Sequence, residues 1–103
     1  MNLNKIIKYL SKSIKEKPDI GIVLGSGLDF FSKSIQNKVI IPYEKIPTFF
    51  KTNVPGHKGE FIYGKINRTT VIVAKGRFHY YEGYNFNQVG SIIQILNSLN
   101  TKL

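Results

Sequence analysis

The sequence predicts an α/β fold in which a mixed β-sheet is flanked by helices. Apolar residues recur at helical spacing near both ends of the chain, which is typical of helices that pack one face on a core. Between them, one apolar run ends in glycines and two strand-like runs are joined by a polar pair. With 103 residues and 42% hydrophobic content, the chain can close one small core, so no second domain or linker is expected.

The first helix is expected near the amino terminus, with lysines opposite its apolar stripe and Pro18 ending it. That stripe consists of Leu3, Ile6, Ile7, Leu10 and Ile14. The buried-type run from Ile20 to Leu24 predicts a central strand that leads into a tight turn. A short helix is expected in "LDFFSKSIQNK", and "VIIPY" predicts a brief strand that Pro42 ends.

The middle of the chain predicts a loop and then a hairpin. Two prolines and two glycines mark "EKIPTFFKTNVPGHKG" as the loop. The runs "EFIYGKIN" and "TTVIVAKG", joined at Asn67 and Arg68, predict the two strands. A second helix follows, and its predicted stripe consists of Phe86, Val89, Ile92, Ile93, Leu96 and Leu99. No strand follows this helix, so the domain formed by residues 1–103 is expected to be incomplete at its carboxyl end.

Composition narrows the class of protein. The chain has no cysteine, which excludes disulfides and thiolate metal sites, and with only His57 and His79 present a zinc site is not expected. No stretch reaches the length of a membrane span, so a soluble cytoplasmic protein is expected. The net charge of +9 leaves a nucleic-acid or polyanion-binding module as an alternative, although the lysines are spread along the chain.

Three segments carry side chains suited to binding an anion. Ser26 lies in "GSG" directly after a predicted strand, although neither GxGxxG nor GxSxG is satisfied there and a plain turn explains the triplet too. His57 follows a Pro-Gly turn in "VPGHKG", where an exposed loop histidine is the alternative. In "GRFHYYEG" an extended backbone would put Arg77, His79 and Tyr81 on one face, although an exposed strand end also fits.

These motifs carry a family resemblance. In their order and separations, "GIVLGSGL", "IP", "VPGHKGEFIYG" and "AKGRFHYYEGY" resemble the N-terminal part of the trimeric purine-nucleoside phosphorylases. The resemblance runs from Ile20 through nearly all of the remaining chain, and "GRFHYYEGY" is its most specific piece. The sequence departs from many members at Asp29, Phe30 and Phe31, which follow "GSGL".

The resemblance implies roles for particular side chains. It assigns phosphate binding to Ser26, His57, Arg77 and His79. It implies further that Tyr81 lies against the ribose and that Glu82 orients these side chains without binding substrate. No certain catalytic acid or base is expected in this chain, and the residues that recognise the base are expected beyond Leu103.

The implied reaction is the phosphorolysis of purine nucleosides to a free base and ribose 1-phosphate, a step of purine salvage. Inorganic phosphate is the expected co-substrate, with no cofactor and no metal. The resemblance implies a homotrimer when the domain is complete, with nucleoside and phosphate as partners and neither a membrane nor nucleic acid. The isolated 103-residue chain is expected to be inactive, and a catalytically silent fragment is the other alternative.

Overall fold

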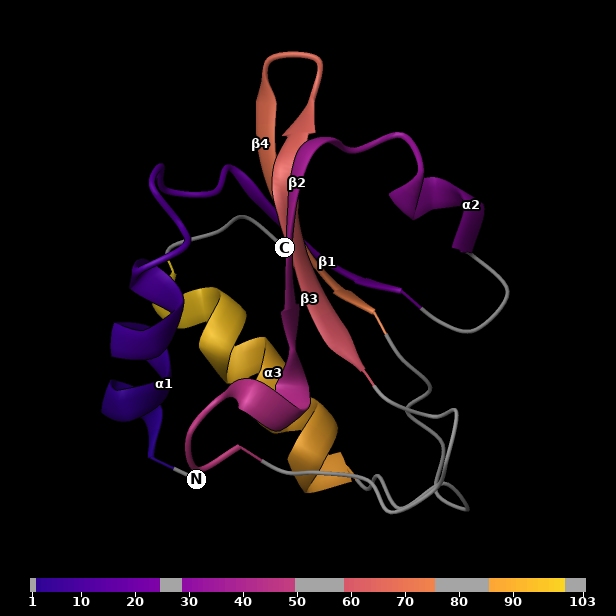
Figure 1. Cartoon of the computed structure of the whole chain (residues 1–103). Helices are drawn as coiled ribbons and strands as arrows, with labels where there is room; N and C mark the ends of the chain where they lie inside the picture. Colours follow the sequence, from indigo (N-terminus) through magenta and orange to yellow (C-terminus); the bar gives the residue numbers. More distant parts are fainter. Residues whose placement is uncertain (1, 25–28, 50–58, 76–85, 100–103) are drawn as a thin grey trace.

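The computed structural model describes residues 2–24, 29–49, 59–75 and 86–99, with only the backbone described at 29–30 and 86–89. The elements follow one another along the chain as drawn in Figure 1. They are α1 (Leu3–Ser11), β1 (Ile20–Leu24), α2 (Asp29–Ser32), β2 (Gln36–Pro42), the 3-10 helix η1 (Tyr43–Lys45), β3 (Glu60–Ile66), β4 (Thr69–Lys75) and α3 (Phe86–Ser98).

The four strands form one mixed sheet in the order β1-β4-β3-β2. Strand β1 runs parallel to β4, whereas β3 pairs antiparallel with both β4 and β2. The predicted α/β class with a mixed sheet is therefore confirmed.

The prediction that Ile20–Leu24 is a central strand is wrong for the sheet that the described residues form, where β1 lies at the edge. Ile20 is 39% exposed and Val23 is 40% exposed. A continuous apolar run indicates that both faces of a strand are covered, but it carries no information about neighbours along its two edges.

The hairpin of β3 and β4 is the best-predicted unit. Its register pairs Ile66 with Thr69, so Asn67 and Arg68 form the two-residue loop that the sequence indicated. Asn67 has φ 56°, a left-handed conformation that asparagine tolerates better than most residues and that tight hairpin loops require.

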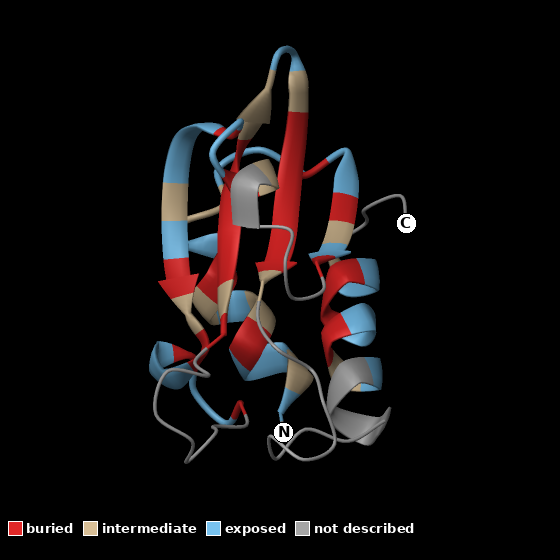
Figure 2. Ribbon diagram, turned by 90° about the vertical axis from the view of Figure 1, so that its right-hand side faces the viewer, coloured by how far each residue is buried: buried red, intermediate tan, exposed pale blue. Residues whose placement is uncertain are grey.

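Helices α1 and α3 cover one face of the sheet, as predicted for the two ends of the chain (Figure 1). Ile6 and Leu10 of α1 are fully buried in this core, and Asn2 caps the helix by accepting a hydrogen bond from the Lys5 N–H at 3.1 Å. Figure 2 shows the buried residues gathered along the strands in the middle of the sheet.

The stripe predicted for the second helix needs one correction. Ile93 was placed on the buried stripe, but it is 41% exposed, whereas Ile95 is fully buried and was not predicted. Ile92 and Leu96 are buried as expected. Which face of a helix is buried against a sheet depends on its tertiary contacts. Adjacent isoleucines in the sequence do not show which of them lies on that buried face.

The second face of the sheet has a smaller apolar cluster, on the side where Figure 1 shows α2. The short helix predicted within "LDFFSKSIQNK" is α2, Asp29–Ser32, and the chain enters β2 at Gln36. Cover on this face is incomplete, and Ile40 of β2 remains 53% exposed.

Strand β2 begins three residues before the predicted Val39, and its register against β3 shifts between Gln36 and Val39. Asn37, with φ 54°, lies in this irregularity. Gly64 on β3 makes room for it, since an added Cβ would lie 2.5 Å from Ile35 Cγ2 and 2.6 Å from the Gln36 carbonyl oxygen.

We therefore expect Gly64→Ala to lower the free energy of unfolding by about 1–3 kcal/mol, the usual cost of overpacking. Gly90→Ala is the matched control. Gly90 lies exposed within α3, and an added Cβ meets nothing within 4 Å, so this change should stabilise by about 0.5–1 kcal/mol through helix propensity. Urea unfolding of both variants measures the difference, and equal midpoints would contradict the account of the bulge.

Candidate functional site

The residues assigned to the site from the sequence lie outside the described part of the chain. They are Ser26, His57, Arg77, His79, Tyr81 and Glu82. Their roles therefore remain predictions. The structure does describe the residues at which their three segments join the sheet.

Those junctions lie together at one end of the sheet. Leu24, the last residue of β1, is in register with Lys75, the last residue of β4. Lys75 is also in register with Glu60, the first residue of β3. Because neighbouring strands lie about 4.8 Å apart, the three junctions span about 10 Å. We call this end of the sheet the Lys75 edge.

Each of the three predicted segments is joined in sequence to a strand end at the Lys75 edge. Residues 25–28, with Ser26, follow Leu24, whereas residues 76–85, with the arginine and second histidine, follow Lys75. Residues 50–58, with His57, precede Gly59 and β3. In open α/β sheets ligands bind beyond the carboxyl ends of parallel strands, and β1 and β4 are parallel strands that both end here.

Two charged residues at this edge were not selected from the sequence. Glu60 and Lys75 are both partly buried and face each other across β3 and β4. Each directly adjoins a motif, so proximity to "VPGHKG" and "GRFHYYEG" was the available signal. Cross-strand register, which links the two residues, cannot be obtained from that signal.

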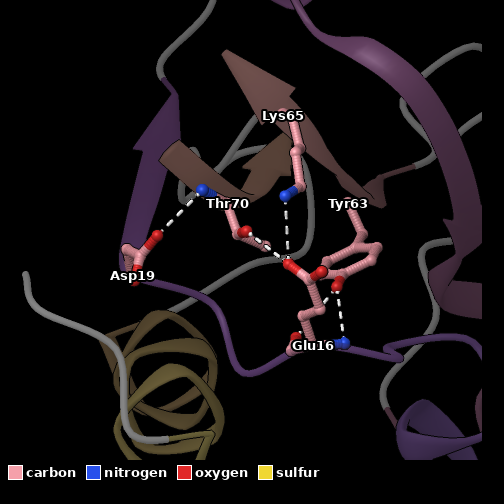
Figure 3. A network of polar contacts seen from close by, with 5 residues as sticks. All are labelled: Glu16, Asp19, Tyr63, Lys65 and Thr70. Carbon is pink, nitrogen blue, oxygen red and sulfur yellow. Dashed lines mark hydrogen bonds and ion pairs between the residues drawn. The ribbon is translucent and has the colours of Figure 1, made fainter. Parts of the chain in front are cut away.

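A network of polar contacts lies at the other end of the sheet (Figure 3). It consists of Glu16, Asp19, Tyr63, Lys65 and Thr70, and we call it the Lys65 network. Lys65 and Thr70 are in register beside the hairpin loop, so the network lies far from the Lys75 edge.

Within the Lys65 network the segment between α1 and β1 is fastened to the hairpin. The Tyr63 hydroxyl donates to the Glu16 carbonyl at 2.8 Å and lies 2.9 Å from the Glu16 N–H, which donates to it. Asp19 accepts from the Thr70 N–H at 2.9 Å, and the Asp19 N–H donates to the Thr70 carbonyl at 2.8 Å. These hydrogen bonds fix the register at which β1 starts to pair with β4, so the Lys65 network has a structural role.

The Glu16 carboxylate completes the network at the surface. It lies 3.1 Å from Lys65 Nζ, and the Thr70 hydroxyl donates to it at 3.1 Å. The hydrogen bond from Lys65, followed by that from Thr70, lowers the pKa of Glu16 below its usual value. The side chain is 60% exposed, so solvent screens the pair and its contribution is small.

Within residues 2–24, 29–49, 59–75 and 86–99, no three His, Cys, Asp or Glu side chains gather in a way that could hold a metal ion. No helix in those same ranges has the length and apolar character needed to cross a membrane.

The fold of this chain is similar to that of nucleoside phosphorylases of known structure. Isoform 2 of purine nucleoside phosphorylase from Schistosoma mansoni, in complex with cytosine and ribose-1-phosphate, matches with a TM-score of 0.87 at 33% identity. That match covers 99% of this chain and 36% of the other. A Schistosoma mansoni purine nucleoside phosphorylase in complex with inosine matches at 0.82 and 38% identity, covering 97% of this chain and 35% of the other.

Curated sequences narrow the similarity to the purine nucleoside phosphorylases. Purine nucleoside phosphorylase 1 of Geobacillus stearothermophilus is 37% identical over 100 residues, which is 97% of this chain and 36% of that protein. No family model matches the chain. Over nearly its whole length the chain is thus similar to purine nucleoside phosphorylases, which confirms the resemblance, and it spans about a third of the length of these relatives.

The lowered pKa of Glu16 gives a prediction for acid stability. The unfolded chain binds the proton of Glu16 more tightly than the folded chain does, so this contribution to stability is present above the usual pKa of about 4.3 and is lost as the pH falls. Glu16→Gln should therefore destabilise the chain slightly near neutral pH, and its difference from the wild type should vanish between about pH 5 and pH 3.

Urea unfolding at a series of pH values measures this effect. Lys65→Met removes the main cause of the lowered pKa, so it should reduce the pH dependence in the same way. A Glu16→Gln variant whose deficit grows as the pH falls would contradict the assignment.

Proposed function

We propose that this chain supplies the phosphate- and ribose-binding part of a purine nucleoside phosphorylase. The observation that carries the proposal is the register of Leu24, Lys75 and Glu60, which brings the junctions of all three anion-binding motifs to one edge. The motifs are 31 residues apart from Ser26 to His57 and 20 residues apart from His57 to Arg77, yet all three adjoin one place in the fold.

The proposed reaction cleaves the bond between the ribose C1′ and the purine nitrogen. A phosphate oxygen bonds to C1′, and the electron pair of the broken bond leaves with the base, which takes up a proton. Positive charge develops on the sugar in the transition state, so a phosphate held beside C1′ both stabilises that charge and acts as the nucleophile.

Each predicted side chain has a role in this scheme. Arg77 offers two parallel N–H donors to the phosphate, and Ser26 and the two histidines add oriented donors. Tyr81 packs against the ribose, and Glu82 orients the phosphate-binding groups. Recognition of the base falls to residues beyond Leu103, in the two thirds of a relative's length that this chain does not span.

The substrates and assembly are proposed from the relatives. Structures of purine nucleoside phosphorylases are described with ribose-1-phosphate, with inosine and with hypoxanthine, which are the product sugar, a nucleoside and a base. We propose the same kinds of ligand here, with inorganic phosphate as co-substrate and no cofactor or metal. We propose a cytoplasmic homotrimer for the complete protein.

The first test is phosphate binding by the 103-residue chain, measured by calorimetry. We expect one site, and we expect Arg77→Ala to weaken it tenfold or more, because a charged hydrogen bond contributes about 1.5–3 kcal/mol. Arg68→Ala is the matched control. It removes the other arginine of the chain, which lies in the hairpin loop away from the Lys75 edge, and should leave binding unchanged.

The same variants distinguish the polyanion alternative. If the charge of +9 acts as a diffuse cationic surface, single-stranded nucleic acid should bind with an affinity that falls steeply with salt. Arg77→Ala and Arg68→Ala should then each weaken nucleic-acid binding only slightly, and to the same extent. That result, together with no phosphate site, would overturn the proposal.

The second test concerns turnover. In a hybrid in which this chain replaces the matched segment of the Geobacillus stearothermophilus relative, Arg77→Ala should slow phosphorolysis of inosine by about tenfold to a hundredfold. Ser26→Ala should cost less, because a neutral hydrogen bond contributes about 0.5–1.5 kcal/mol. Both losses should appear in the dependence on phosphate, with the KM for inosine little changed. Steady-state rates at varied phosphate check this, and an unaltered phosphate dependence in Arg77→Ala would refute the assignment.

A further inference from the structure

Three aromatic rings pack together where β2 ends and β3 begins. Tyr43 meets Phe49 edge-to-face with ring centroids 5.0 Å apart, and it meets Phe61 in the same way at 4.9 Å. Phe49 and Phe61 stack with centroids 6.1 Å apart. All three side chains are buried, and we call them the aromatic cluster.

The aromatic cluster holds both ends of the segment that carries His57. Phe49 is the last described residue before residues 50–58, and Gly59 is the first after them. The Tyr43 N–H donates to the Gly59 carbonyl at 3.1 Å. One residue, Tyr43, thus contacts the chain on both sides of these nine residues.

Gly59 is required for this arrangement. A Cβ added there would overlap the Tyr43 ring, and it would also lie 3.1 Å from the Lys75 carbonyl oxygen. The absence of a side chain therefore lets the ring lie directly against the backbone at the start of β3. Any larger residue would therefore have to displace the Tyr43 ring, whereas the contact with the Lys75 carbonyl oxygen would need a shift of only a few tenths of an ångström.

The other end of the segment is held in a strained conformation. Thr48 has φ 62°, which is a costly backbone angle for a β-branched residue. Its hydroxyl accepts a hydrogen bond from the Asn2 N–H at 2.9 Å, which ties this turn to the start of α1. The direction in which the chain enters Phe49 is therefore specified at an energetic cost.

We propose that Tyr43, acting with Gly59 and Phe49, is a positioning residue that fixes both ends of the His57 segment so that the histidine is presented to the phosphate. This inference rests on the proposed function. In general, fixing the two ends of a loop lowers the conformational entropy that remains to be lost when the loop binds a ligand. A displacement of about 1 Å is enough to lose an oriented donor, so the anchors govern what His57 can contribute.

The chain offers an internal control, because it has only two histidines, on different segments. His79 follows Lys75, the last residue of β4, whereas the contacts of Tyr43 with Phe49 and Gly59 lie on either side of residues 50–58. Phosphate titrated into the 103-residue chain can be followed by NMR at both imidazole rings. In the wild type, both rings should shift with one common dissociation constant.

Gly59→Ala is the main variant and Gly64→Ala its matched control, since each adds one methyl group to a crowded, buried glycine at or beside the same strand. In Gly59→Ala the limiting shift of His57 should fall at least threefold, while that of His79 is kept and phosphate binds about two- to tenfold more weakly. Gly64→Ala should keep both shifts. Tyr43→Phe retains the ring and should behave as the wild type.

Phe49→Leu perturbs the opposite anchor with a smaller cost to the core, and it keeps the test valid if Gly59→Ala does not fold. It should cause the same selective loss at His57. If neither wild-type ring responds to phosphate, the proposed function fails, and this inference with it. If the wild type responds but the anchor variants change both rings equally or neither, or if Gly64→Ala shows the same selective loss, the inference alone is overturned.

Discussion

Strand β4 is hydrogen-bonded along both edges and covered on both faces, and the other elements are arranged around it. Its residues from Val71 to Ala74 are at most 2% exposed. Because successive side chains alternate between faces, Ile72 and Ala74 belong to the core under α1 and α3, and Val71 and Val73 to the cluster on the other side. Its parallel pairing with β1 brings Leu24 beside Lys75, and its antiparallel pairing with β3 brings Glu60 there.

Local pattern was enough to predict those parts of the fold in which sequence neighbours are also spatial neighbours. The Asn67 loop and the stripe of α1 from Leu3 to Leu10 are of this kind. The expectation that Pro18 ends this helix is wrong, because α1 ends at Ser11, and Ile14 packs on the core from outside the helix. The edge position of β1, the bulge of β2 and the burial of Ile95 in place of Ile93 were not predicted, since each depends on a partner distant in sequence. Periodicity describes one segment at a time and cannot report such pairings.

The candidate site, too, could be predicted only in part from local sequence. The types of residue in "GRFHYYEG" and "VPGHKG" indicated anion binding, and their order indicated a family, but neither indicates which strand ends adjoin. The register of Lys75 with its two neighbours supplies that information. The aromatic cluster was missed because Phe49 was assigned to the loop "EKIPTFFKTNVPGHKG" and Tyr43 to the end of the strand "VIIPY". Their packing on Phe61 of a later strand leaves no periodic signal in either segment.

Strand β4 is seven residues long, so the hairpin loop and the Lys75 edge lie about 20 Å apart. The loop residues Asn67 and Arg68 are exposed, and the Lys65 network secures the strands immediately behind them. A fluorescent dye or an affinity tag inserted at this loop would therefore lie at the end of the sheet opposite the Lys75 edge. The fold in this way provides a place to immobilise or label the protein without altering the strand ends at that edge.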